Sequence, residues 1–390
     1  MAAMADFGAP SRRLASPHSS PAQLPPVLMQ HLAYDNQPFQ PLPPPVGKPP
    51  YHIDLATMLG ADRMAAITAA GKLVFHSAGD TGGVQSPQSQ QLVASHMADD
   101  CHRGGPDAPA FLYLLGDVVY FYGQASDYYA QFYSPYETYP APIFAIPGNH
   151  DGDPFDKTAT SLSAFVENFC ALRPHLTREA GDAPRDAMTQ PNVYFTLDTP
   201  YATIVGLYTN IPDGGKLDAT QVEWLNSELK SAPAGKSLIL ALHHPVYSLD
   251  YVHHGSAYML GLIDSAVSAG GRHPDLVLTG HVHNYQRFTR QVGGRQVPFI
   301  VAGAGGYWHL HTLPKVNRQK IIPPLPIADL PGVTLAAYSD DRHGYLTIET
   351  SPGHIGATYW TVPRSHEAWS APAASADSFE VDLKEAQLAS

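Results

Sequence analysis

Short apolar segments that run directly into Asp, Asn or His constrain this 390-residue chain more than any other feature. Uninterrupted apolar runs of this length are typical of strands that are buried on both faces. The segments are 73-LVFHSA-78 before Asp80, 111-FLYLL-115 before Asp117, 142-PIFAI-146 before Asn149, 237-SLILAL-242 before His243, and 275-DLVLT-279 before His281 and His283. Because ligand sites in α/β sheets gather at the carboxyl ends of strands, we expect these polar side chains to meet.

The order of the other patterns predicts the fold class. Helical patterns follow the early strands, whereas the later strands follow each other directly, so part of the strand pairing should be antiparallel. We therefore expect an α/β fold, a two-sheet mixed β-sandwich flanked by helices. The further candidate strands are 193–198, 202–208, 298–303, 344–349 and 355–361, and the candidate helices are 57–70, 88–101, 158–171, 218–231 and 256–268.

Composition along the chain predicts its domain organisation. Residues 1–50 form a Pro-rich extension, and 51–71 lead into the main domain with a possible helix. The main domain is expected over 72–363, and a Pro-rich stretch at 312–335 is interpreted as a surface insertion within it. The acidic tail at 364–390 is expected to be poorly ordered.

Charge and cysteine content exclude some classes of protein. Hydrophobic residues make up 44% and charged residues 15% of the chain, which is typical of a globular protein. A net charge of −12 argues against binding of nucleic-acid polymers or anionic membranes. No secretory signal or transmembrane run is recognised, so the sequence by itself predicts a cytoplasmic protein. Cys101 and Cys170 are compatible with one disulfide or two free thiols, and nothing indicates the oligomeric state.

The residue types at the strand ends suit a site for two metal ions. Carboxylates neutralise hard cations, and imidazoles bind Zn, Fe or Mn. Two ions about 3.5–4 Å apart can hold a phosphate between them. Asp117 follows the middle strand of the set and is the natural bridging ligand. Each signal alone has a simpler interpretation, since Gly-Asp and Asn commonly form turns and paired histidines can pack or face solvent. Their combination favours a dinuclear site.

At this point the chain resembles the calcineurin-like metallophosphoesterases, and within them the purple acid phosphatases. The resemblance covers about residues 72 to 362 and is carried by the motifs 79-GDTG-82, 116-GDVVY-120, 148-GNHD-151, 243-HHPVY-247 and 280-GHVH-283. Most relatives place a metal-binding histidine at the position of Gly82. Purple acid phosphatases have glycine there and use the tyrosine of GDxxY, which corresponds to Tyr120.

The resemblance implies two metal ions, Fe(III) together with Fe(II), Zn(II) or Mn(II). The first ion would be held by Asp80, Asp117, Tyr120 and His283. The second would be held by Asp117, Asn149, His243 and His281. His244 would then support the site without binding metal.

The resemblance also assigns catalytic roles. His150 matches the histidine that protonates the leaving oxygen, and His254 matches a second catalytic position. His253 is assigned to substrate binding, although both His253 and His254 are compatible with surface positions. Asp151 replaces the more usual Glu and is expected to orient His150.

The implied activity is that of an acid phosphatase, in which a metal-bound hydroxide hydrolyses small phosphomonoesters. The alternatives are a phosphodiesterase or nucleotide hydrolase on the same site, or a non-catalytic phosphate-binding protein. The Tyr-rich segment 121–139 can either stack against a base or aryl group or pack as a surface loop. The resemblance implies a secreted or periplasmic location, in contrast to the cytoplasmic one that the sequence by itself predicts.

Overall fold

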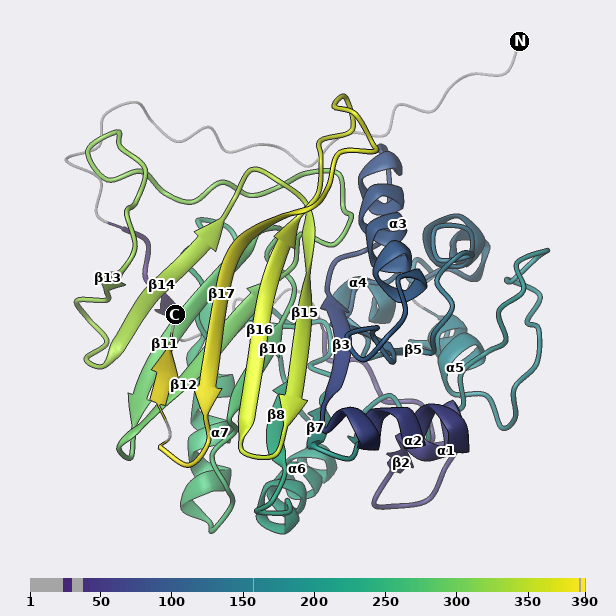
Figure 1. Cartoon of the computed structure of the whole chain (residues 1–390), viewed down its shortest axis with the longest axis horizontal. Helices are drawn as coiled ribbons and strands as arrows, with labels where there is room; N and C mark the ends of the chain where they lie inside the picture. The colour runs from purple at the N-terminus through teal and green to yellow at the C-terminus, as the bar shows by residue number, and fades with distance from the viewer. Residues whose placement is uncertain (1–23, 30–37, 157, 386, 390) are drawn as a thin grey trace.

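Two β-sheets that pack face to face form the centre of the molecule in the computed structural model (Figure 1). The structure describes residues 24–29, 38–156, 158–385 and 387–389. Within these residues, one sheet has nine strands in the order β13 (Leu325–Pro326), β14 (Val333–Ser339), β11 (Tyr285–Val292), β12 (Arg295–Ala302), β10 (Leu276–Thr279), β8 (Ser237–Ala241), β7 (Ala202–Gly206), β6 (Phe195–Asp198) and β2 (His52–Asp54). The other has seven, in the order β18 (Gln387–Ala389), β17 (Ala374–Asp382), β16 (His354–Thr361), β15 (Gly344–Ser351), β3 (Leu73–Ala78), β4 (Leu112–Leu114) and β5 (Ile143–Ala145).

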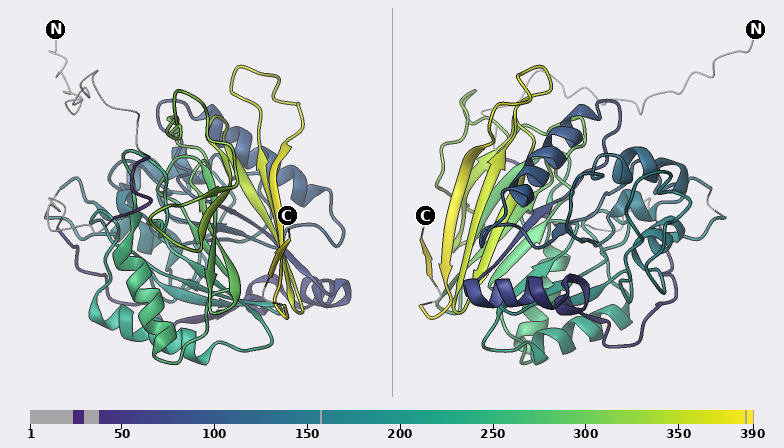
Figure 2. Two further views of the ribbon diagram at one scale, coloured as in Figure 1. Left: turned by 90° about the vertical axis from the view of Figure 1, so that its left-hand side faces the viewer. Right: turned by 45° about the vertical axis from the view of Figure 1, so that its right-hand side comes forward.

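Helices cover the outer faces of the two sheets, as Figures 1 and 2 show. On the side of the seven-stranded sheet lie α1 (Leu55–Leu59), α2 (Ala61–Ala70) and α3 (Gln88–His102). On the side of the nine-stranded sheet lie α6 (Ala219–Ser231) and α7 (Ala257–Ser268). The short helices α4 (Asn149–Gly152) and α5 (Ser163–Phe169) follow β5, and β1 (Leu28–Met29) pairs with β9 (Gly255–Ser256). The expected two-sheet α/β sandwich with flanking helices is confirmed.

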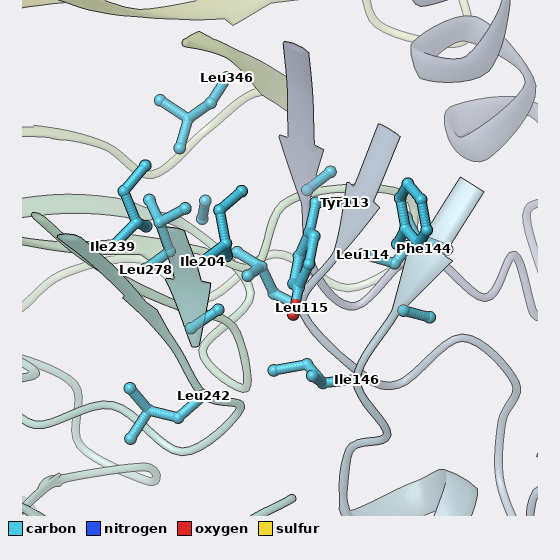
Figure 3. Packing of buried hydrophobic residues seen from close by; sticks show 14 of the residues in the cluster. Tyr113, Leu114, Leu115, Phe144, Ile146, Ile204, Ile239, Leu242, Leu278 and Leu346 are labelled. Carbon is cyan, nitrogen blue, oxygen red and sulfur yellow. The ribbon is translucent and has the colours of Figure 1, made fainter. Parts of the chain in front are cut away.

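The apolar runs pack between the sheets, as expected from their lack of alternation. Tyr113 and Leu115 from the seven-stranded side point toward Ile204, Ile239 and Leu278 from the nine-stranded side (Figure 3). Burial of such side chains contributes roughly 25 cal/mol for each Å² of apolar surface removed from water. The interior between the sheets therefore holds the central strands in a fixed register.

Strand register places the expected ligands at one edge of the sandwich. The parallel pairs β3–β4 and β4–β5 bring Ala78, Leu114 and Ala145 level with each other. In the other sheet, the parallel pair β8–β10 aligns Ala241 with Leu278. The carboxyl ends of these strands thus meet at the same edge, which is where the polar residues follow in the sequence.

The C-terminal segment corrects one expectation. Residues 364–390 were expected to be poorly ordered, but β17 pairs with β16 along its whole length. Phe379 and Val381 are buried, while the residues next to them are exposed. Asp377, on the same face, accepts two hydrogen bonds from Arg287 of β11, at 2.7 and 2.9 Å. The acidic, Ala- and Ser-rich composition concealed this alternation.

Other boundaries differ from the expectation for local reasons. The expected helix 57–70 is divided into α1 and α2 at Gly60, whose φ is +76°. The Pro-rich stretch 312–335 contains β13 and the first residues of β14, so part of it extends the edge of the nine-stranded sheet. Strand β11 was not expected because it is rich in polar residues. The two cysteines are free thiols, Cys170 buried and Cys101 half-buried.

Candidate metal centre

The turns after the central strands are shaped so that their side chains point across the sheet edge. Asp80, Asp117 and His281 have φ values of 56°, 52° and 70°, in the left-handed region that residues with a Cβ seldom adopt. Backbone hydrogen bonds between turns hold this geometry, including Asp80 N to Gly116 O at 2.9 Å. Strained backbone of this kind persists only where the surrounding structure enforces it, and it clusters at functional sites.

Gly148 shows why small residues accompany the donors. A Cβ at this position would lie 2.1 Å from Asp117 Oδ1, far inside contact distance. The turn after β5 can therefore approach the Asp117 carboxylate only if residue 148 has no side chain.

A first group of donors consists of Tyr120, Asp80 and His283. The Tyr120 hydroxyl lies 3.1 Å from Asp80 Oδ1 and 3.3 Å from His283 Nε2. His283 Nε2 is 3.6 Å from Asp80 Oδ1. His283 Nδ1 donates to the carbonyl of His309 at 3.0 Å, so in the neutral ring Nε2 presents its lone pair to the other donors.

A second group consists of Asn149, His243 and His281. Asn149 Oδ1 is 3.0 Å from His243 Nε2 and 2.9 Å from His281 Nδ1. His243 Nδ1 donates to the carbonyl of Leu115 at 2.8 Å, which again leaves Nε2 as the ligand atom. The second group thus presents an amide oxygen and two imidazole nitrogens toward one point.

Asp117 lies between the two groups, as a bridging ligand must. Its Oδ2 is 3.5 Å from His243 Nε2, and donor atoms of Asp80, Asp117 and His243 all lie within 4.8 Å of one another. Its Oδ1 accepts a hydrogen bond from the backbone of His150 at 2.9 Å, which fixes the carboxylate in this position. The structure brings together all seven residues that were expected as metal ligands.

The electrostatics of these donors fit bound cations. Burial raises the pKa of Asp80 well above its usual range, and burial together with neighbouring histidines lowers the pKa values of His281 and His283. Burial lowers the pKa of His243, but the Asp117 and Asp80 carboxylates outweigh it and raise the value to about 9. Carboxylate, amide and phenol oxygens and imidazole nitrogens that converge in a buried site are ligand types that metal ions take in proteins. The residues therefore fit a pair of metal ions.

Gly82 and Tyr120 are linked by packing. A Cβ at residue 82 would lie 2.8 Å from Tyr120 Cδ2 and 2.5 Å from Gln131 Oε1. Gln131 in turn bonds both backbone groups of Tyr120, accepting from its N–H and donating to its carbonyl, each at 2.8 Å. A histidine at residue 82 would therefore collide with the tyrosine that occupies the site in this chain.

His150 is held by a backbone carbonyl, and Asp151 has a different role from the one expected. His150 Nδ1 donates to the carbonyl of Phe121 at 2.9 Å. Asp151 accepts from the N–H groups of Gly148 at 2.8 Å, Val119 at 3.0 Å and Val118 at 3.2 Å. Its short side chain reaches the backbone of both motif loops, so Asp151 orients the loops rather than the His150 ring.

The histidines after β8 surround His281. The ring centroid of His253 is 4.3 Å from that of His281. The ring centroid of His244 is 4.4 Å from that of His281, and His244 Nδ1 is hydrogen-bonded to Thr209 Oγ1 at 2.7 Å. His244 is thus placed to pack against His281, as expected for a residue that supports the site without binding metal. His254 is half-buried on the same loop as His253, and its contact with phosphate stays a prediction.

Sequence reasoning missed the segment 307-YWHLH-311, which follows β12 and covers the first donor group. The Tyr307 ring lies 4.3 Å from the rings of both Tyr120 and His283. His311 lies 4.7 Å from His283 and nearly parallel to His253 at 5.4 Å. The density of aromatic and histidine residues directly after 302-AGAGG-306 was the available signal.

A two-sheet sandwich with Asp, Asn, His and Tyr donors at the carboxyl ends of its central strands defines a metallophosphoesterase. The chain belongs to the calcineurin-like phosphoesterase family, whose model matches residues 78–285. This confirms the superfamily to which the sequence motifs pointed. None of the described helices is long and apolar enough to cross a membrane.

Within this family, the chain is similar in sequence to purple acid phosphatases, and a solved purple acid phosphatase shares its fold. The chain is 26% identical to purple acid phosphatase 21 and 29% identical to purple acid phosphatase 18 of Arabidopsis thaliana, each over 42% of this chain and 36% of the relative. The chain thus spans about a third of the length of these relatives. Purple acid phosphatase PPD1 of yellow lupin (Lupinus luteus) shares the fold, with a TM-score of 0.54 at 17% identity over 81% of this chain and 55% of PPD1.

Proposed function

We propose that the protein is an acid phosphatase that hydrolyses small phosphomonoesters at a dinuclear centre of Fe(III) and a divalent ion, Fe(II), Zn(II) or Mn(II). The observation that carries this proposal is the Tyr120 hydroxyl, 3.1 Å from Asp80 and 3.3 Å from His283. Phenolate is a hard anionic donor that favours Fe(III). The packing of Tyr120 against Gly82 supports the same assignment, because it excludes the histidine that other family members use.

The donors divide between two ions through Asp117. Tyr120, Asp80 and His283 would hold the ferric ion, and Asn149, His243 and His281 would hold the divalent one. Bound there, the pair of ions would neutralise the charge of a phosphate group and activate water.

His150 is placed to assist departure of the leaving alcohol. Because its Nδ1 donates to the Phe121 carbonyl, Nε2 is the nitrogen left to hydrogen-bond the leaving oxygen. The backbone N–H of His150 itself donates to Asp117 Oδ1, which holds the residue that carries the ring against the proposed bridging carboxylate. His253, beside His281, would hydrogen-bond a phosphate oxygen from the opposite side, with His254 as its neighbour on the same loop.

Hydrolysis of p-nitrophenyl phosphate by iron-loaded protein, from mildly acidic to neutral pH, tests the proposal. We expect turnover, and we expect His150→Ala to lower kcat by roughly 10²–10⁴-fold while metal content is unchanged, since His150 is not a ligand. Absence of turnover by the metal-loaded protein would refute the proposal. Faster turnover of bis(p-nitrophenyl) phosphate than of the monoester would instead favour a phosphodiesterase.

A further inference from the structure

Aromatic side chains are exposed on the segment that begins at Phe121 and on the segment that follows His150. Phe121 is 40% exposed, Tyr122 39% and Phe155 65%. The other tyrosines of the Tyr-rich segment 121–139 differ in burial. Tyr129 is exposed, and the core buries the rest, Tyr128, Tyr133, Tyr136 and Tyr139. Large exposed aromatic groups beside a catalytic centre require an explanation that core packing does not provide.

Phe121 contacts the His150 ring, and Tyr122, the next residue in the chain, contacts Phe155. The Phe121 ring lies 6.0 Å from the His150 ring at an interplanar angle of 74°, and 6.3 Å from the Tyr307 ring at 87°. The Tyr122 ring lies 5.3 Å from the Phe155 ring at 64°. These edge-to-face arrangements leave ring faces available to a further planar group.

A cavity of about 330 Å³ is lined by Tyr122, Phe155 and Asp151, the residue that follows His150. Two of its lining residues adjoin the hydrogen bond that orients His150, since Asp151 follows His150 and Tyr122 follows Phe121. This volume is at the lower end of the range of small-molecule sites.

The charge of the cavity restricts what it can bind. Its lining includes the carboxyl groups of Asp156, Glu167 and Glu179, whereas the described residues that line it include no Lys or Arg. An anionic group such as a second phosphate would meet like charges here and find no cation. An uncharged group is therefore favoured.

We propose that Phe121, Tyr122 and Phe155, termed the aromatic pocket, bind the leaving group of the substrate and select an uncharged, planar aromatic alcohol. This inference rests on the proposed phosphatase function. If the metal donors hold the phosphate and His150 hydrogen-bonds the leaving oxygen, the carbon attached to that oxygen extends beyond His150. The exposed ring next to His150 is that of Phe121, and the chain continues from it to Tyr122 and the cavity that Tyr122 and Phe155 line. A planar ring there gains contacts that a saturated ring cannot make.

The test compares benzyl phosphate with cyclohexylmethyl phosphate. The two esters have the same carbon skeleton and leaving alcohols of similar basicity, but only the first is planar. We expect a higher kcat/KM for benzyl phosphate, and Phe121→Leu or Phe155→Leu should each lower the benzyl-to-cyclohexylmethyl ratio about three- to tenfold. Phe121→Leu keeps the backbone carbonyl that orients His150. Adding a carboxylate to the benzyl ring should also lower kcat/KM.

Tyr201→Leu is the control, because Tyr201 precedes β7 and so lies at the sheet edge opposite the metal centre. The benzyl-to-cyclohexylmethyl ratio of kcat/KM should be the same in Tyr201→Leu as in the wild type, even if the substitution lowers the stability of the protein. A wild-type ratio near one, or a ratio that both pocket variants leave unchanged, would overturn the aromatic pocket. If neither ester is hydrolysed, the proposed function fails. In that case, calorimetry compares the affinities of the protein for phenylphosphonate and cyclohexylphosphonate. Tighter binding of phenylphosphonate would support the aromatic pocket, and equal affinities would overturn it.

Discussion

Asp151 should be essential to the geometry of the centre even though it is not one of the seven candidate metal donors. Its carboxylate accepts hydrogen bonds from Val118 and Val119 on the loop that carries Asp117 and Tyr120. It also accepts one from Gly148, which precedes Asn149 and His150. A single buried side chain therefore connects the loop that carries Tyr120 to the loop that carries Asn149.

The cost of removing this carboxylate follows from its partners. Burial raises the pKa of Asp151 to about 7, so the carboxyl is partly ionised at neutral pH. A hydrogen bond contributes about 0.5–1.5 kcal/mol to a neutral group and about 1.5–3 kcal/mol to a charged one, and a buried donor left without a partner costs about 1–3 kcal/mol. Because the three bonds share one acceptor, their effects are not additive, and we expect Asp151→Ala to lower the free energy of unfolding by roughly 3–6 kcal/mol. Total stabilities of about 5–15 kcal/mol make this a large loss. Asp151→Asn should lose less, because its amide oxygen still accepts.

Two assays on the same samples separate stability from site geometry. Urea denaturation measures the free energy of unfolding, and metal content after dialysis measures how well the loops hold the ions. We expect Asp151→Ala to lower both, and Asp151→Asn to lower both to a smaller extent. Asp156→Asn is the matched control, since Asp156 is exposed and, in the described structure, its carboxylate accepts hydrogen bonds only from Thr158.

The reasoning would be refuted if Asp151→Ala unfolded within about 1 kcal/mol of the wild type and retained its metal. Asp151 would then be replaceable by water at all three N–H groups.

Two further predictions concern other parts of the chain. Asp377→Ala should lower the free energy of unfolding by about 3–5 kcal/mol, because it leaves Arg287 charged and buried. Glu380→Ala, on the exposed face of β17, is the control and should change the free energy of unfolding by under about 0.5 kcal/mol. If urea denaturation gave similar values for the two variants, the assignment of β17 as a structural strand would be contradicted. Hydrogen bonds with Asp198 and Glu228 raise the pKa of His52 from 6.5 to about 10, so its stabilisation is complete below pH 6.5 and is lost as pH rises toward 10. The stability difference between wild type and His52→Leu should shrink over that range, and a constant difference would contradict the linkage.

The sequence allowed the residues of the candidate metal centre to be located because each depends on local signals. An apolar run followed by a tight polar turn identifies a strand end, and parallel pairing of β3, β4 and β5 then aligns Asp80, Asp117 and Asn149 without further information. Gly82 was informative for the same reason, since its missing side chain is the space beside Tyr120.

Residues that depend on tertiary contacts were not predictable in the same way. The carbonyls of Leu115 and His309 orient two histidines of the candidate metal centre, yet a backbone carbonyl leaves no signature in the amino-acid sequence. Strand β17 was missed because an acidic residue such as Asp377 on the inner face conceals the alternation of buried and exposed residues. Its inward position is explained only by the buried Arg287 and by pairing with β16, which are tertiary contacts. Asp151 was assigned to the wrong partner because the distance to the loop backbones is set by the fold.

Metal analysis together with a visible absorption spectrum tests the central claim most directly, on the wild type and on Tyr120→Phe. The wild type should contain two metal ions per chain, at least one of them iron, and should show a visible tyrosinate-to-iron band. Tyr120→Phe should lose that band while Asn149, His243 and His281 still hold the second ion. A colourless wild type that contains only Zn or Mn, or a band that survives in Tyr120→Phe, would contradict the account.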